Sequence, residues 1–138
     1  MKASQQLETL FQALADRTRL RLLNLIGDAE VCVCFFVEVL GEPQPKISRH
    51  LGVLRSAGLV AARRDGKWMH YRLTIPEHLE SICAGVLATL KHDPEMQRDR
   101  AALARACCSP RVPELLRRAP KPQPLVDGHV DDSRAGVS

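Results

Sequence analysis

The chain has 138 residues with 20 Lys and Arg against 16 Asp and Glu, which gives a formal net charge of +4 and a pI near 9.0. This length fits one globular domain with an extension and argues against two ordinary domains, and the mild basic excess favours a polyanionic partner only where it is clustered. The sequence has no apolar run of about 18 residues and no secretory signal, so we expect a cytoplasmic protein without a membrane span, whose cysteines stay reduced.

The first part of the chain is typical of two amphipathic helices. Apolar residues recur at helical spacing over Ser4–Ala15, and Asp16 is a suitable N-cap for a second helix over Arg17–Ile26. Gly27 is suited to the end of that helix. The apolar segment Glu30–Leu40 is predicted to form a short buried helix, although its β-branched residues also fit a strand.

A basic helix and a β-hairpin follow. Pro45 has no amide hydrogen to lose and suits the first position of a helix, so we expect a helix over Pro45–Ala57. Two β-type runs, 59–64 and 67–73, flank an Asp-Gly dipeptide that is favoured in tight hairpins. Together these elements predict a mainly α fold with a β-hairpin wing, the winged helix-turn-helix.

The chain is expected to divide into three parts. Residues 1–92 form the DNA-binding and dimerisation domain, in which the N-terminal helix and an apolar helix over Pro76–Lys91 are buried between two copies. The alternative is that both apolar stripes pack within one monomer. Residues 93–109 form a helical extension, and the proline-rich residues 110–138 form a disordered tail, because they offer few large apolar side chains to bury.

Basic and polar residues gather on the two elements that a winged helix brings to one duplex. In a winged helix-turn-helix, side chains at the start of the second helix of the motif, here Pro45–Ala57, reach base edges and phosphates most easily. The hairpin lies beside the DNA backbone. A charge run alone is usually a solvated face, but on two converging elements it indicates double-stranded operator DNA as the partner. The predicted contacts are Gln44, Lys46, Ser48, Arg49, His50, Arg63, Arg64 and Lys67.

The chain resembles the ArsR/SmtB family of dimeric winged-helix repressors, and especially its arsenic-responsive branch, in four segments: LADRTRLRLLNLI, EVCVC, QPKISRHLGVLRSAGLV and RRDGKWMHYRL. The resemblance covers Leu7 to Leu90. It implies a homodimer without a prosthetic group that stays on its operator until As(III) or Sb(III) binds. A methylated trivalent arsenical, which needs fewer ligands, is a further candidate inducer.

Two departures from the family pattern concern metal ligands. The arsenic-responsive branch carries Cys-x-Cys-x-x-Cys before the helix that enters the DNA groove, the reading helix, which is expected here over Pro45–Ala57. This chain has Cys32, Cys34 and then Val37 at the third place. The family's zinc pattern on the last helix needs an Asp and a second His, where this chain has Pro76 and Thr89. We therefore do not expect a zinc site there.

The five cysteines are the candidate inducer ligands. Two sulfurs on one soft ion lie within about 4.6 Å of each other, but residues i and i+2 of a regular helix point to nearly opposite sides. We therefore expect the first turn of this helix to unwind when Cys32 and Cys34 bind one ion, and to disturb the reading helix. Cys107 and Cys108 either complete that site, from the same chain or its dimer mate, or form a second site with Cys83, which also fits a core position.

Three other functions compete with this interpretation. A redox-responsive repressor would use the same thiols as disulfides, and Arg105 and Arg111 near the vicinal cysteines favour the accessible thiolates it needs. An enzyme such as a thiol oxidoreductase is not expected, since the sequence shows no βαβ pattern, catalytic constellation or glycine-rich phosphate loop. A constitutive DNA binder would carry its cysteines incidentally.

Overall fold

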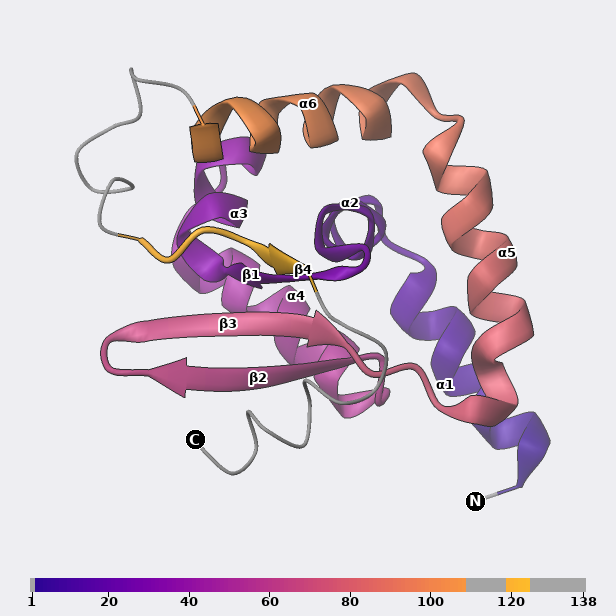
Figure 1. Cartoon of the computed structure of the whole chain (residues 1–138). Helices are drawn as coiled ribbons and strands as arrows, with labels where there is room; N and C mark the ends of the chain where they lie inside the picture. Colours follow the sequence, from indigo (N-terminus) through magenta and orange to yellow (C-terminus); the bar gives the residue numbers. More distant parts are fainter. Residues whose placement is uncertain (1, 109–118, 125–138) are drawn as a thin grey trace.

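The computed structural model describes residues 2–108 and 119–124, and these form helices packed around a small antiparallel sheet (Figure 1). The described elements are α1 (Ala3–Leu14), α2 (Arg17–Ile26), β1 (Ala29–Cys32), α3 (Val33–Leu40), α4 (Gln44–Ser56), β2 (Val60–Asp65), β3 (Trp68–Leu73), the 3-10 helix η1 (Glu77–Leu79), α5 (Glu80–Lys91), α6 (Pro94–Cys108) and β4 (Gln123–Pro124). None of the helices in this part of the chain combines the length and hydrophobicity that a membrane crossing requires.

Local signals set the ends of α2 and α4. The Asp16 side chain accepts a hydrogen bond from the Arg19 amide at 3.1 Å and caps α2, while Gly27 ends that helix with a φ of 52°. The prediction for α2 is therefore confirmed. Helix α4 begins one residue earlier than expected, because Pro43 is the last extended residue and Pro45 falls within the first turn, where a missing amide costs nothing.

The segment expected to be one helix over Glu30–Leu40 is divided between two elements. Its first residues belong to strand β1, and only Val33–Leu40 form helix α3. Strand β1 pairs antiparallel with β3, with Val31 opposite Tyr71 and Cys32 opposite His70. The single-helix prediction is wrong at its start because β3 supplies hydrogen-bond partners that the local sequence does not reveal.

The hairpin lies where the sequence predicts it, but its turn is one residue later. Asp65 pairs with Trp68 as the last step of the β2–β3 ladder, so Gly66 and Lys67 make the turn. Gly66 has a φ of 61°, which favours glycine. The sheet has the order β2-β3-β1-β4, and with α3 and α4 the hairpin completes the winged helix-turn-helix.

The C-terminal part extends the domain. The helix expected over Pro76–Lys91 begins as η1 and continues as α5, and α6 runs to Cys108. The disorder expected for residues 110–138 does not hold at 119–124, since Gln123 and Pro124 pair with β1. The other residues of that tail lie outside the described part of the chain.

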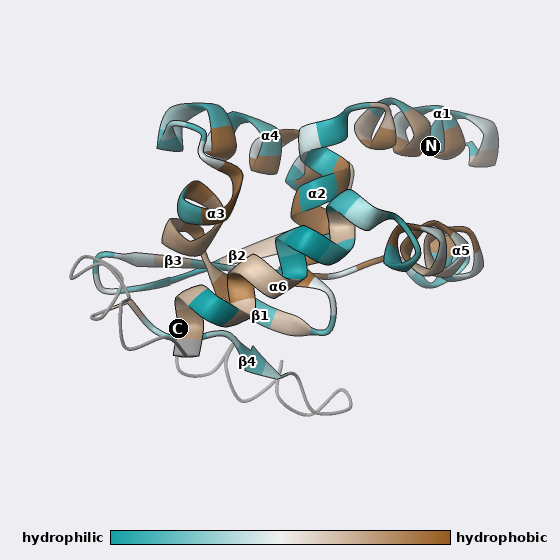
Figure 2. Cartoon of the chain, turned by 90° about the horizontal axis from the view of Figure 1, so that it is seen from above, coloured by the Kyte–Doolittle hydropathy of each residue, from teal (hydrophilic) through white to brown (hydrophobic). Residues whose placement is uncertain are grey.

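The core joins the first four helices to the sheet. Its largest fully buried side chains include Phe35 and Phe36 of α3, which pack with apolar residues from α1, α2 and α4. Helices α1 and α5 lie at one end of the molecule, and α3 lies at the other, on the side where the hairpin tip projects (Figure 2). The thiol-bearing start of α3 is thus far from α5.

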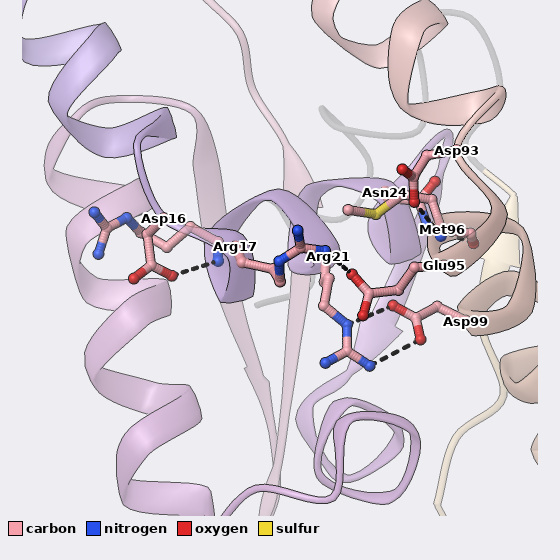
Figure 3. A network of polar contacts seen from close by, with 9 residues as sticks. Asp16, Arg17, Arg21, Asn24, Asp93, Glu95, Met96 and Asp99 are labelled. Atoms are coloured by element: carbon pink, nitrogen blue, oxygen red, sulfur yellow. Dashed lines mark hydrogen bonds and ion pairs between the residues drawn. The ribbon is translucent and has the colours of Figure 1, made fainter.

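A polar network docks α6 on α2 (Figure 3). The Arg21 guanidinium donates to both Asp99 carboxylate oxygens at 2.7 and 2.9 Å, and the Asn24 side-chain amide donates to the Met96 carbonyl at 3.0 Å. The Arg100 guanidinium donates a hydrogen bond of 2.7 Å to the backbone carbonyl of Asn24. With this anchor, the C-terminal end of α6 lies over α3 (Figure 1).

Candidate functional site

Cys32 and Cys34 meet at the junction between β1 and α3. Their Sγ atoms lie 3.0 Å apart, inside the limit of about 4.6 Å for two sulfurs that share one ion. Cys32 is the N-cap of α3 and has an extended backbone, so its side chain does not follow the helical direction of Cys34. The expectation that the first turn must unwind to bring the sulfurs together is therefore wrong, because the pair is preformed.

The contact between the two sulfurs moves the pKa values of the two thiols in opposite directions. The hydrogen bond from the Cys34 thiol lowers the pKa of Cys32 to about 7 against the effect of burial, and backbone amides that include those of Cys34 and Met69 add to the lowering. The same hydrogen bond and burial raise the pKa of Cys34. At pH 7, Cys32 is therefore about half ionised, while Cys34 keeps its proton. Thiolates are the form that binds soft ions.

A third ligand is not assembled among the described side chains, which contain no group of three or more His, Cys, Asp or Glu able to hold a metal ion. Cys107 is half-buried on α6 and packs against the core, at the end of the helix that lies over α3. The side chain of Cys108 lies outside the described part. Helix α6 already contacts α3, but the described side chains do not place Cys107 in one ligand group with Cys32 and Cys34.

Cys83 lies apart from the other thiols. It is buried on α5 against apolar side chains that include Leu14, Leu23 and Leu59, and this burial raises the pKa of its thiol. Helix α5 is at the opposite end of the molecule from the end of α6 that carries Cys107 (Figure 1). The structure does not bring Cys83 together with Cys107, and its surroundings are those of a core residue.

The predicted DNA contacts on α4 do not share one environment. Gln44, Ser48 and Arg49 are exposed in its first turns, and Lys46 forms an ion pair of 3.1 Å with Glu42 one turn before it. His50 is half-buried and faces the start of α2, where its Nδ1 lies 3.2 Å from Arg19 Nη1 and 3.8 Å from Asp16 Oδ1. His50 thus contacts the neighbouring helix within the domain.

The predicted contacts on the hairpin also differ. Arg64 and Lys67 are exposed, and the Lys67 ammonium lies 5.0 Å from the centre of the Trp68 ring. Arg63 is bound instead to Glu30 of β1, a buried carboxylate that we did not single out from the sequence. The sequence offered one sign of this pair, because Glu30 is an acidic residue at the start of an otherwise apolar segment. A carboxylate that is buried with such a segment needs a cationic partner.

Comparisons with known proteins agree with this fold. Residues 16–62 match the family model described as "Bacterial regulatory protein, arsR family". The "Arsenical resistance operon repressor" of Escherichia coli is 46% identical over 79 residues, which are 56% of this chain and 66% of that protein. The match thus spans less than two thirds of that relative.

Two further relatives are covered more completely. The "Arsenic resistance transcriptional regulator ArsR2" of Pseudomonas putida is 41% identical over 93 residues, which are 67% of this chain and 80% of that protein. A homodimeric winged helix-turn-helix DNA-binding domain from Mycobacterium bovis superposes with a TM-score of 0.55 and 31% identity, and covers 63% of this chain and 80% of that one.

Proposed function

The chain belongs to the arsR family of bacterial regulatory proteins, and on that premise we propose that it represses transcription until its thiols capture trivalent arsenic or antimony. The observation that carries this proposal is the separation of 3.0 Å between the Cys32 and Cys34 sulfurs, one of them poised as a thiolate. The relatives are named as repressors and regulators, so the oxidoreductase alternative has no support among them.

Operator binding uses α4 and the wing of two subunits. The exposed residues of the first turns of α4 face base edges, and Arg64 and Lys67 contact the backbone. Dimerisation brings two such surfaces to half-sites about one DNA turn apart, roughly 34 Å, and so selects a two-fold symmetric operator. Apolar side chains on α1 and α5 supply the dimer interface, where Phe11 is 54% exposed in the single chain.

Inducer capture begins at the thiol pair. The Cys32 thiolate bonds to the arsenic of arsenite first and displaces one hydroxyl group, which leaves as water with a proton from solvent. The Cys34 thiol then displaces a second hydroxyl group, which leaves as water with the thiol proton. Cys107 at the end of α6 supplies the third thiolate, and Cys108 of the same or the partner subunit is the alternative. The bound ion lowers operator affinity only to the extent that it binds the DNA-incompetent state more tightly, by a few kcal/mol for a large population shift.

A redox-responsive repressor is the second candidate, and the lowered pKa of Cys32 favours it. The two functions separate in one assay. A redox regulator releases its operator when treated with peroxide and rebinds after reduction, whereas a metalloid regulator releases it on addition of arsenite while a reductant is present.

The experiment that tests the proposal is a titration of the protein on its own promoter DNA with arsenite, antimonite, a methylated trivalent arsenical, zinc and cadmium. Cys32→Ser and Cys34→Ser should abolish release by arsenite while operator binding without inducer is kept. Cys83→Ser is the matched control and should respond like the parent protein. If the double variant Cys32→Ser, Cys34→Ser still releases the operator fully on addition of arsenite, these two cysteines do not capture the inducer and the proposal is wrong.

A further inference from the structure

Strand β1 carries both the Cys32 thiol and a second functional side chain, Glu30. Cys32 lies opposite His70 of β3, and His70 lies opposite Arg63 of β2, so these three residues form one row across the sheet. Residues in one row point to the same face, and Glu30 shares that face because it precedes Cys32 by two positions. Strand β1, which we call the sensing strand because it carries Cys32, therefore meets the wing on one side of the sheet.

Glu30 and Arg63 form an ion pair across this face. The Glu30 side chain is 1% exposed, and its Oε1 accepts hydrogen bonds from Arg63 Nη2 at 2.6 Å and from Arg63 Nε at 3.1 Å. This bonding to Glu30 also raises the pKa of Arg63. A carboxylate buried to this degree is costly without a cationic partner, so the structure commits Arg63 to Glu30.

The wing is attached to the sensing strand at a second point. Cys32 pairs with His70 in the antiparallel β1–β3 ladder, and the backbone amide of the adjacent Met69 helps to lower the pKa of Cys32. A displacement of Cys32 thus acts on β3 directly, and it acts on β2 through the Glu30–Arg63 pair. Both strands of the hairpin are connected to the residue that captures the inducer.

We propose that Glu30 and Arg63 are positioning residues that fix the wing on the sensing strand, and that Arg63 does not contact DNA phosphate. The pair sets the wing angle for operator binding and transmits movement of Cys32 to the hairpin. The part that concerns operator binding stands without an inducer, and the part that concerns transmission rests on the proposed function.

Neutralising the charge of Glu30 distinguishes two roles that this residue could have in operator binding, positioning of the wing and electrostatic repulsion of DNA. Glu30→Gln removes a negative charge and releases Arg63, so a purely electrostatic role predicts tighter binding to DNA. The positioning role predicts weaker binding, by about tenfold at constant salt, because the wing loses its anchor. Asp65→Asn is the matched control, since Asp65 is exposed at the end of β2 and its neutralisation should leave binding equal or tighter.

Two Arg63 variants complete the test. Arg63→Lys keeps a positive charge that can contact phosphate but loses the planar fork that holds Glu30, so we expect it to bind as weakly as Glu30→Gln. In Glu30→Gln with Arg63→Gln the two losses should not add, and binding should fall by about tenfold rather than a hundredfold. Thermal melting of each variant confirms that it is folded under the conditions of the binding assay.

Trp68, the only tryptophan of the chain, reports on the wing itself because it begins β3. Saturating arsenite should change its fluorescence in the parent protein, and Glu30→Gln should reduce that change while arsenite still binds with the same stoichiometry. A parent protein that binds arsenite without a change in Trp68 fluorescence would refute transmission to the wing, whereas one that binds no arsenite would refute the metalloid function but not the anchoring of the wing. Operator binding by Glu30→Gln that equals or exceeds that of the parent, or additive losses in the double variant, would overturn the positioning role.

Discussion

Arg21 of α2 holds Asp99 of α6 through two hydrogen bonds, of 2.7 and 2.9 Å, in a position where the Asp99 side chain is 7% exposed. Such a two-point contact fixes direction as well as distance between two helices. It matters for the candidate site because the far end of α6 carries Cys107 over α3. The network in Figure 3 thus sets where the third thiolate of the proposed site begins its approach.

Substitution of Asp99 tests this anchor. Asp99→Asn should lower the free energy of unfolding by about 1–3 kcal/mol, because a hydrogen-bonded charge pair is replaced by a neutral contact at a buried position. It should also raise the arsenite concentration needed for half release of operator. Urea denaturation and an operator titration measure the two effects.

Glu95→Gln is the control for that variant. Glu95 pairs with Arg17 on the same two helices, but the Arg17 side chain is 71% exposed. Exposed ion pairs contribute less than about 1 kcal/mol, so the control should be close to the parent protein in both assays. Equal losses in the two variants would show that the buried position of Asp99 has no special role.

The lowered pKa of Cys32 gives a prediction about the donor in Cys34. Cys34→Ala removes the hydrogen bond that is the main cause of the lowering, so the pKa of Cys32 should rise from about 7 toward that of an ordinary thiol. Cys34→Ser keeps a donor and should retain a large part of the shift. The pH dependence of alkylation by iodoacetamide, followed at Cys32 by peptide mass spectrometry, measures both variants.

The pair also sets how inducer release depends on pH. Arsenite is As(OH)3 near neutral pH, and each As–S bond that forms releases one hydroxyl group as water. Capture by two thiols therefore needs no net proton, whereas capture by the Cys32 thiolate and the Cys34 thiol takes up one proton from solvent. The apparent affinity for arsenite should therefore be nearly level below about pH 7 and fall as the pH rises above it. Isothermal titration in buffers of different ionisation enthalpy counts the protons taken up, and an equal count at pH 6 and pH 8 would contradict the lowered pKa of Cys32.

Arg49 and His50 are neighbours in the sequence but should behave differently. Arg49→Ala removes an exposed cation from α4, so the slope of log affinity against log salt should decrease by about 0.9 if Arg49 contacts one phosphate. His50→Gln should leave that slope unchanged and destabilise the domain, because His50 faces Arg19 and Asp16 of the neighbouring helix. Operator binding at several salt concentrations and thermal melting separate the two roles.

Short-range signals explain what the sequence predicts well. The Asp16 cap and the Gly27 ending lie within a few residues of α2, and the exposed start of α4 follows from helical spacing around Ile47. The hairpin follows from two β-type runs beside Gly66. These features need no knowledge of the tertiary fold.

Features that depend on distant partners were predicted less well. Strand β1 exists because β3 pairs with it, and this pairing moved the start of α3 to Val33 and brought the Cys32 sulfur to Cys34. Glu30 meets Arg63 only after that register is formed. Periodicity along one segment does not encode such contacts, so both the preformed thiol pair and the buried ion pair were missed.

The most direct test of the proposed capture by Cys32 and Cys34 is X-ray absorption at the arsenic edge on arsenite-loaded protein, which counts the sulfur neighbours of the ion. Cys32→Ser and Cys34→Ser should each reduce the number of bound sulfurs by one relative to the parent, and Cys83→Ser should leave it unchanged. An identical sulfur shell in the parent and in the double Cys32→Ser, Cys34→Ser variant would contradict the proposal.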